Sequence, residues 1–137
     1  MPCLSGSFDR SLGVVIQLGV VPSGTDLAQL GSNARLFPAL LDTGASATCI
    51  SPLVVSALGL APIGKRPMVS ATGAVPKNVY LVHLLVPFGQ VAHFVRDAQV
   101  MEFDADQNTP FQILIGRDII CQGALTMSFD GHFTFSL

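Results

Sequence analysis

The most informative stretch of this chain reads Leu40-Leu41-Asp42-Thr43-Gly44-Ala45. Two apolar residues lead a strand toward the interior, an acid follows, and Thr-Gly-Ala then turns the chain with little side-chain bulk. An unpaired carboxylate in apolar surroundings is costly or has a raised pKa, so a chain that keeps one there usually uses it. Asp42 is therefore the first candidate for a functional residue.

The sequence contains this acidic motif once. Asp42 is the only acid in the 137 residues that is followed by Ser or Thr and then Gly. Chance alone places such a tripeptide in roughly one chain in twenty of this length, so the motif is weak without its context. Chemistry that needs two such carboxylates would require a second copy of the chain.

The composition is that of one apolar domain. Half of the residues are hydrophobic and 12% are charged, against about 25% charged in an average soluble domain. This composition fits either a dense β core or apolar surface buried against a partner, as in an obligate dimer. Both interpretations stay open at this point.

Charge and hydropathy exclude several partners. A net charge of −2 with scattered basic residues gives no footprint for nucleic acid. No apolar run approaches the ~20 residues that a helix needs to cross a membrane, and no leader-like segment opens the chain. We expect buried thiols at Cys49 and Cys121 in a reducing compartment, hence a cytoplasmic protein.

Most of the chain reads as strand. We expect strands at residues 12–20, 37–42, 47–50, 68–71, 78–86, 91–101 and 111–115, a surface loop at 22–36, and a closing hairpin at 124–137. Apolar residues alternate on both sides of Asp130-Gly131, which predicts one apolar face on that hairpin. A terminal strand of this kind needs a pairing partner, and a partner chain is one solution.

Two short helices are also predicted. Ser51 is a good N-cap, Pro52 suits the first helical position, and Gly59 can close the first helix. A second helix is expected over residues 117–122, where Gly123 stops it.

The order of these elements supplies the context that the acidic motif lacks. A hairpin at residues 67–86, with Thr72-Gly73-Ala74 at its tip, follows Asp42, and Ile113-Leu114-Ile115-Gly116-Arg117-Asp118 comes next. In this order the chain, over residues 12–137, resembles the retropepsin-like aspartic proteases, the single-domain relatives of pepsin. Leu58-Gly59-Leu60 and the closing hairpin look most like the soluble bacterial forms.

The resemblance implies a fold and an assembly. It implies one all-β domain over residues 1–137, a closed orthogonal β-barrel with one or two short helices, active as a two-fold dimer. Asp42 is then the catalytic residue, one from each protomer, with no metal or cofactor. Two carboxylates about 3 Å apart share a proton, so one activates water while the other hydrogen-bonds the scissile carbonyl.

The resemblance also assigns roles to the neighbours of Asp42. Thr43 hydrogen-bonds across the dimer axis, Gly44 offers a carbonyl to the substrate, and Ala45 keeps the wall low. The flap tip is Thr72, Gly73 and Ala74, and the structural residues near the site are Ile115, Gly116, Arg117 and Asp118. The competing interpretations are an Asx turn at Asp42 and a plain β-turn at the hairpin tip.

One position departs from the family pattern. The Arg of the Ile-Gly-Arg-Asp motif pairs, in many retropepsins, with an acid directly after Asp-Thr-Gly-Ala, but here that position is Ser46. Arg117 must therefore bind Asp118, a backbone carbonyl or an acid of the other chain. The three histidines, His83, His93 and His132, are expected to be strand residues rather than metal ligands.

These features predict a homodimeric aspartic endopeptidase that cleaves extended peptide or protein segments between the flaps and the floor of the site. The main alternative is a catalytically weak or inactive retropepsin-fold module for dimerisation or peptide binding, which Ser46 mildly favours. An unrelated small β-barrel binding protein would need both motifs to co-occur by accident. No nucleic acid or membrane partner is expected.

Overall fold

The computed structural model describes residues 2–29 and 33–137. Its strands are β1 (Cys3–Ser7), β2 (Val15–Pro22), β3 (Arg35–Leu41), β4 (Cys49–Ile50), β5 (Gly64–Ser70), β6 (Gly73–Phe88), β7 (Val91–Glu102), β8 (Ile113–Ile115), β9 (Ala124–Met127) and β10 (His132–Ser136). The helices among these residues are short: the 3₁₀ helix η1 (Leu27–Gln29), α2 (Pro52–Leu58) and α3 (Arg117–Ile120). None of them is long and apolar enough to cross a membrane.

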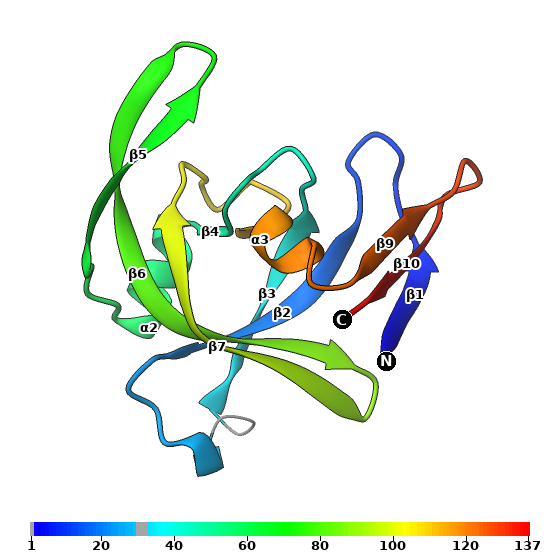
Figure 1. Ribbon diagram of the computed structural model, residues 1–137, viewed down its shortest axis with the longest axis horizontal. Coiled ribbons are helices and arrows are strands. Elements are labelled where there is room, and N and C mark those ends of the chain that lie inside the picture. The colour runs from blue at the N-terminus through cyan, green and yellow to red at the C-terminus, as the bar shows by residue number, and fades with distance from the viewer. Residues whose placement is uncertain (1, 30–32) are drawn as a thin grey trace.

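Six strands close into a barrel. They follow one another in the order β2-β3-β8-β4-β7-β6, and β6 pairs back onto β2, for example through Leu84 opposite Val20. The first part of β6 leaves the barrel and forms a hairpin with β5 that projects from it (Figure 1). The predicted all-β barrel with short helices is confirmed.

A parallel strand pair places the acidic motif. β3 runs parallel to β8, with Leu41 opposite Ile115, while β4 lies on the other side of β8. The residues that follow two parallel strands emerge at the same edge of the sheet. Asp42 and Gly116 therefore lie side by side although 73 residues of sequence separate them.

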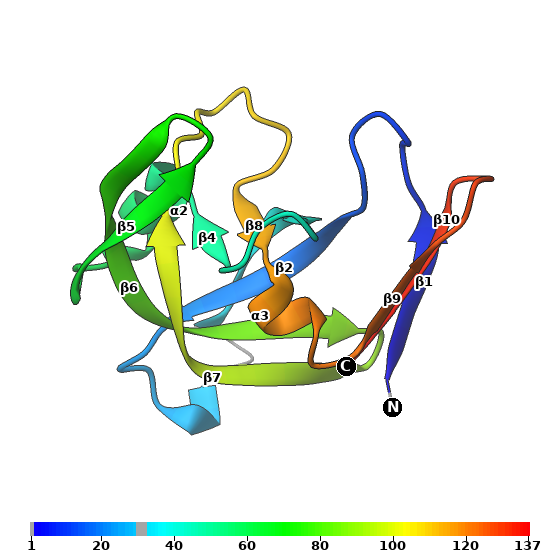
Figure 2. The ribbon, with the colours of Figure 1, turned by 45° about the horizontal axis from the view of Figure 1, so that its top comes forward.

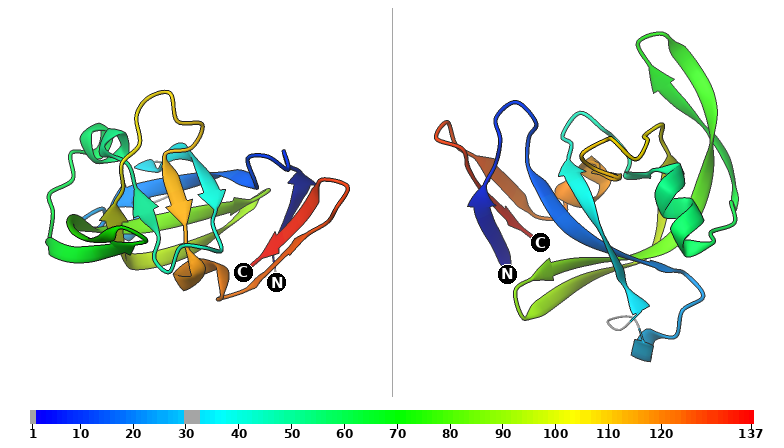
Figure 3. Two further views of the ribbon diagram at one scale, coloured as in Figure 1. Left: turned by 90° about the horizontal axis from the view of Figure 1, so that it is seen from above. Right: turned by 180° about the vertical axis from the view of Figure 1, so that it is seen from behind.

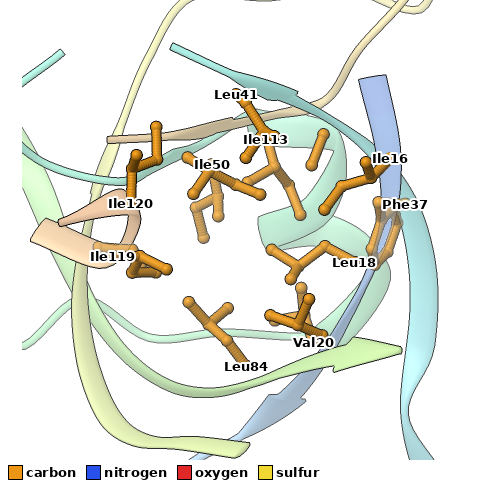
Figure 4. Packing of buried hydrophobic residues seen from close by; sticks show 14 of the residues in the cluster. Ile16, Leu18, Val20, Phe37, Leu41, Ile50, Leu84, Ile113, Ile119 and Ile120 are labelled. Atoms are coloured by element: carbon orange, nitrogen blue, oxygen red, sulfur yellow. The ribbon is translucent and has the colours of Figure 1, made fainter. Parts of the chain in front are cut away.

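The barrel interior is filled by branched aliphatic side chains (Figure 4). Leu18 from β2, Leu84 from β6 and Ile113 from β8 are fully buried there. Ile119 and Ile120 of α3 pack into the same cluster, so this four-residue helix is held by its apolar face rather than by its length.

Helix α2 follows the predicted capping pattern. The Ser51 Oγ accepts a hydrogen bond from the N–H of Val54, Pro52 is the first helical residue, and Gly59 closes the helix in the left-handed region at φ 61°. Ser51 also donates to the Gln112 side chain at 2.6 Å, which joins the helix start to the segment before β8.

A second sheet holds both chain termini. It has three strands in the order β1-β10-β9 and stands beside the barrel, as Figures 2 and 3 show. Cys3 lies opposite Ser136, so the first strand pairs with the last. The sequence interpretation missed β1, because Cys3–Ser7 is rich in small polar residues and carries no apolar alternation. The closing strand thus finds partners on both sides within its own chain.

Several strands and helices begin or end at other residues than the sequence predicts. The opening strand begins at Val15 rather than at residue 12, because Gly13, at φ 108°, ends a turn that starts at Asp9. Within the expected loop 22–36, β3 already begins at Arg35, and residues 30–32 lie outside the described residues. The helix predicted over 117–122 ends at Ile120.

One burial prediction is half wrong. Cys49 is buried, but Cys121 is exposed. Cys121 caps the C-terminus of α3, and the buried face of that helix is made by Ile119 and Ile120 instead.

Candidate active site

The Asp42 carboxylate is held by its own loop. The residue is half-buried at the end of β3, and its backbone N–H donates to the carbonyl of Ile115 at 2.9 Å. One carboxylate oxygen, Oδ1, accepts the N–H of Gly44 at 2.9 Å. That contact is an Asx turn, so the competing turn-forming role is real, but it occupies only one oxygen. No hydrogen bond reaches Oδ2 from the described residues of the chain.

Close packing requires glycine at one position of the site and leaves little room at a second. A Cβ at Gly116 would lie 2.6 Å from the backbone carbonyl carbon of Ala47, closer than real side chains approach. A Cβ at Gly44 would lie 3.1 Å from the Asp42 carboxylate. The sequence therefore keeps glycine where the loop after β3 meets the loop after β8.

Arg117 binds backbone carbonyls of the loop that follows Asp42. Its N–H donates to the carbonyl of Ala45 at 2.9 Å, and its Nη1 donates to the carbonyl of Thr43 at 2.8 Å. Of the three partners that the sequence left open, the structure selects the backbone carbonyl. The side chain is exposed. Because a backbone carbonyl holds the guanidinium, no acid at position 46 is needed to place it.

Asp118 is fixed by a residue that sequence reasoning missed. The buried Thr48 donates its N–H to Asp118 Oδ2 at 3.0 Å and its hydroxyl to Oδ1 at 2.8 Å. The same hydroxyl accepts the N–H of Gly116 at 3.1 Å. Thr48 thus ties together the two loops that carry Asp42 and Arg117. The sequence offered one sign of this role: Thr48 carries a hydroxyl among small apolar residues, directly before β4.

Asp42 lies at the wall of an apolar cleft of about 370 Å³. The cleft is lined by Asp42, Gly44, Ala45, Ser46, Ala47, Cys49, Pro67, Met68, Val69, Met101, Phe103 and Leu114. Asp42 is the only charged residue among them. The cleft can accept an apolar side chain next to a single carboxylate.

The β5–β6 hairpin, which contains the predicted flap, forms one side of this cleft through its first strand. The lining residues are Pro67, Met68 and Val69 of β5. The turn itself is made by Ala71 and Thr72, because Gly73 already pairs with Ser70 at φ 130° and Ala74 pairs with Val69. The predicted tip therefore spans the turn and the start of β6, and it does not line the cleft in one chain.

Polar contacts fix the base of the hairpin. Lys77 forms an ion pair with Asp104 at 3.0 Å. Asn78 and Tyr80 both donate to the Glu102 carboxylate, at 3.2 and 3.3 Å. At the free end of the hairpin, the side-chain hydrogen bonds among the described residues stay within the turn, from Ser70 to Thr72 and Gly73, and Val69 is 80% exposed. The hairpin is thus anchored to β7 at one end and projects freely at the other.

The surroundings of the Cys49 thiol, which lines the same cleft as Asp42, make it unreactive. Cys49 lines the cleft and donates a weak hydrogen bond to the carbonyl of Ala47. Burial, with the negative charges of Asp118 and Asp42 nearby, raises the pKa of this thiol to about 11. A thiolate nucleophile is therefore not part of this site at neutral pH.

Comparisons with known proteins identify the family and a similar fold. Residues 28–119 match a family model described as "Aspartyl protease". The crystal structure of a retropepsin-like aspartic protease from Rickettsia conorii superposes with a TM-score of 0.60 at 11% identity, covering 97% of this chain and 89% of that one. The solution structure of the simian foamy virus (mac) protease gives a TM-score of 0.44 at 20% identity, covering 77% of this chain and 92% of that one.

No curated protein sequence matches the chain. The family model spans most of it, from the loop before β3 to the middle of α3, and includes both motifs around Asp42 and Gly116. The retropepsin-like resemblance seen in the sequence is confirmed, and the chain belongs to the aspartyl protease family.

Proposed function

We propose that this protein is an aspartic endopeptidase that works as a homodimer, with one Asp42 from each protomer at a shared site. The observation that carries the proposal is the single carboxylate at the wall of an apolar cleft beneath a projecting hairpin. One carboxylate cannot act as general base and general acid at the same moment. A two-fold axis beside Asp42 supplies the second one.

The proposed reaction follows from two carboxylates at hydrogen-bonding distance. They cannot both ionise, so the pair holds one proton and titrates as a unit. The ionised Asp42 takes a proton from water as the water attacks the peptide carbonyl, and the protonated Asp42 hydrogen-bonds the carbonyl oxygen. The roles then exchange as the leaving amine is protonated.

The other site residues receive supporting roles in this proposal. The exposed Thr43 hydroxyl has no hydrogen-bond partner among the described residues, which suits a contact across the axis. The β5–β6 hairpin acts as the flap, and an extended peptide lies between it and the floor of the cleft. Closure of the flap brings Thr72, Gly73 and Ala74 toward the substrate.

The test compares wild type with Asp42→Asn on a library of extended peptides between pH 4 and 7. We expect the amide to lower kcat by at least about a thousandfold, because it cannot act as the base. The purified variant should keep the wild-type circular dichroism and oligomeric state.

Equal cleavage by both proteins would assign the activity to another site or to a contaminant. If the wild-type dimer binds peptides but cleaves none of them, the protein is the non-catalytic binding module instead. The exposed Ser46, at the position where the family pattern leads one to expect an acid, is the feature that keeps this second function in view.

A further inference from the structure

The β5–β6 hairpin carries a large share of the positive charge of the chain. Lys65, Arg66 and Lys77 lie on its paired segments, between Gly64 and Val79, which contain no acid. The whole chain has seven basic residues and a net charge of −2. The hairpin is therefore a positive element of an acidic molecule.

Two of these three cations have no acidic partner. Lys77 forms its ion pair with Asp104 at 3.0 Å. Arg66 donates from Nη2 to the side-chain oxygen of Gln99, which is a neutral group. Among the described residues, neither Lys65 nor Arg66 forms an ion pair. A guanidinium has five N–H donors and stays charged, so Arg66 can still bind an anion.

Arg66 lies on the inner face of β5. Side chains alternate along a strand, so Arg66 shares a face with Met68, while Lys65 belongs to the opposite face. Met68 is half-buried and the other residues of β5 are exposed, so the face with Met68 is the one turned toward the barrel. The contact of Arg66 with Gln99 on β7 has the same direction.

The Arg66–Gln99 contact extends the apolar wall of the cleft. Met68 of β5 and Met101 of β7 both line the cleft. Arg66 and Gln99 each lie two residues before one of these methionines, and the two strands run in the same direction because both are antiparallel to β6. Two residues of a strand span about 7 Å. Over that distance the wall changes from two thioethers to a cation and an amide.

We propose that Arg66 is a specificity-determining residue that binds an acidic side chain of the substrate. This acid lies two positions along the peptide from the apolar side chain in the cleft. The inference rests on the proposed function, because it takes the peptide to lie extended between the hairpin and the floor.

The spacing and the chemistry of the two partners agree. In an extended peptide every second side chain is on the same side, about 7 Å apart, which matches the step from Met68 to Arg66. A carboxylate at that place accepts two N–H groups of the planar guanidinium. Gln99 holds the guanidinium in position without neutralising it.

The test scans a cleaved peptide with glutamate. Each position is occupied in turn by glutamate, glutamine or lysine, at low salt and pH 6, where glutamate is ionised. We expect one position, two residues from the one that prefers a large apolar side chain, at which glutamate raises kcat/KM about fivefold over glutamine. That factor is the gain from a well-formed exposed ion pair. Lysine at this position should give the lowest kcat/KM.

Charge variants assign the preference to a residue. Arg66→Gln should bring the glutamate-to-glutamine ratio of kcat/KM to about one, and Arg66→Glu should reverse the preference in favour of lysine. Lys65→Gln is the matched control, since it removes the same charge from the opposite face of β5 and should keep the preference. A preference that survives in Arg66→Gln, or that only Lys65→Gln abolishes, would overturn the assignment.

The wild-type protein gives two further readouts that need no variant. Salt at about 0.5 M should reduce the glutamate-to-glutamine ratio, because it screens exposed charges. A pH well below the ordinary pKa of glutamate, about 4.3, should reduce it as well, because the protonated side chain carries no charge. A ratio that neither change affects would show that no ion pair is involved.

The outcomes separate this inference from the proposed function. Asp42→Asn reports the preference through the peptide dissociation constants alone, so it can be measured without cleavage. Peptides that are cleaved or bound with no preference for glutamate refute only the role of Arg66. A wild-type protein that neither binds nor cleaves any extended peptide refutes the proposed site, and the role of Arg66 with it.

Discussion

Gly116 is held by contacts that no other residue could satisfy. It stands between β8 and α3, with the backbone of Ala47 so close that a Cβ would lie 2.6 Å from a carbonyl carbon. The hydroxyl of the buried Thr48 accepts its N–H at 3.1 Å. The loop with Asp42 and the loop with Arg117 can approach each other only because this position has no side chain.

Gly116→Ala should destabilise the protein by about 2 kcal/mol or more, because the added methyl group meets backbone rather than a movable side chain. Gly64→Ala is the control, since a Cβ there meets no atom within 4 Å. Urea unfolding of both variants measures the difference. Equal midpoints would mean that the two loops can move apart without cost.

At the scale of elements, the sequence predicted the helices and strands that carry a local, repeated residue pattern. Helix α2 has a cap at both ends, and the closing hairpin alternates around Asp130-Gly131. β1 was missed because its residues, among them Gly6, carry no pattern of their own; only pairing with β10 makes them a strand. Strand boundaries were likewise decided by long-range pairing.

The residues of the candidate site likewise fall into two groups: those that a local motif predicted and those that only the folded chain brings together. Asp42 and Gly116 lie in recognisable local motifs, and the sequence located both. The cleft wall formed by Met68, Met101 and Phe103 comes from two segments that are far apart in the sequence, β5 and the end of β7, so no local pattern could assemble it. The flap prediction rested on the hairpin tip, whereas β5 lines the cleft through Pro67, Met68 and Val69.

The β5 strand provides a test of this wall. Met68→Gln keeps the length of the side chain but places a polar amide in the cleft. We expect kcat/KM to fall about fivefold for peptides with a large apolar side chain beside the cut, as loss of roughly 1 kcal/mol of apolar contact implies. Lys65→Gln, on the same strand but outside the cleft, should leave kcat/KM unchanged. Equal effects would show that the hairpin acts only through its overall position.

At the scale of the whole molecule, the proposed function makes the chain one half of a symmetric site. Its barrel, cleft and hairpin are complete, yet the cleft contains one carboxylate. Activity should therefore depend on assembly, and protein concentration becomes a variable of the chemistry.

Mixing provides the corresponding prediction. When an excess of Asp42→Asn is equilibrated with wild type, wild-type chains are drawn into heterodimers that hold one Asp42. The cleavage rate should then fall in proportion to the wild-type homodimer that remains. It should be well below the rate of a control in which the same amount of wild type is mixed with buffer instead of the variant and is equally dimeric. An unchanged rate would indicate that each chain works alone.

The pairing of β1 with β10 has a consequence for how the protein forms. Cys3 pairs with Ser136, so nearly the whole chain must be present before the three-stranded sheet can close. Contacts between residues so far apart in sequence slow folding, because the entropy of a long loop is lost before the contact stabilises anything. The β9–β10 hairpin can form locally, and the docking of β1 onto it is thus expected to be a late step of folding.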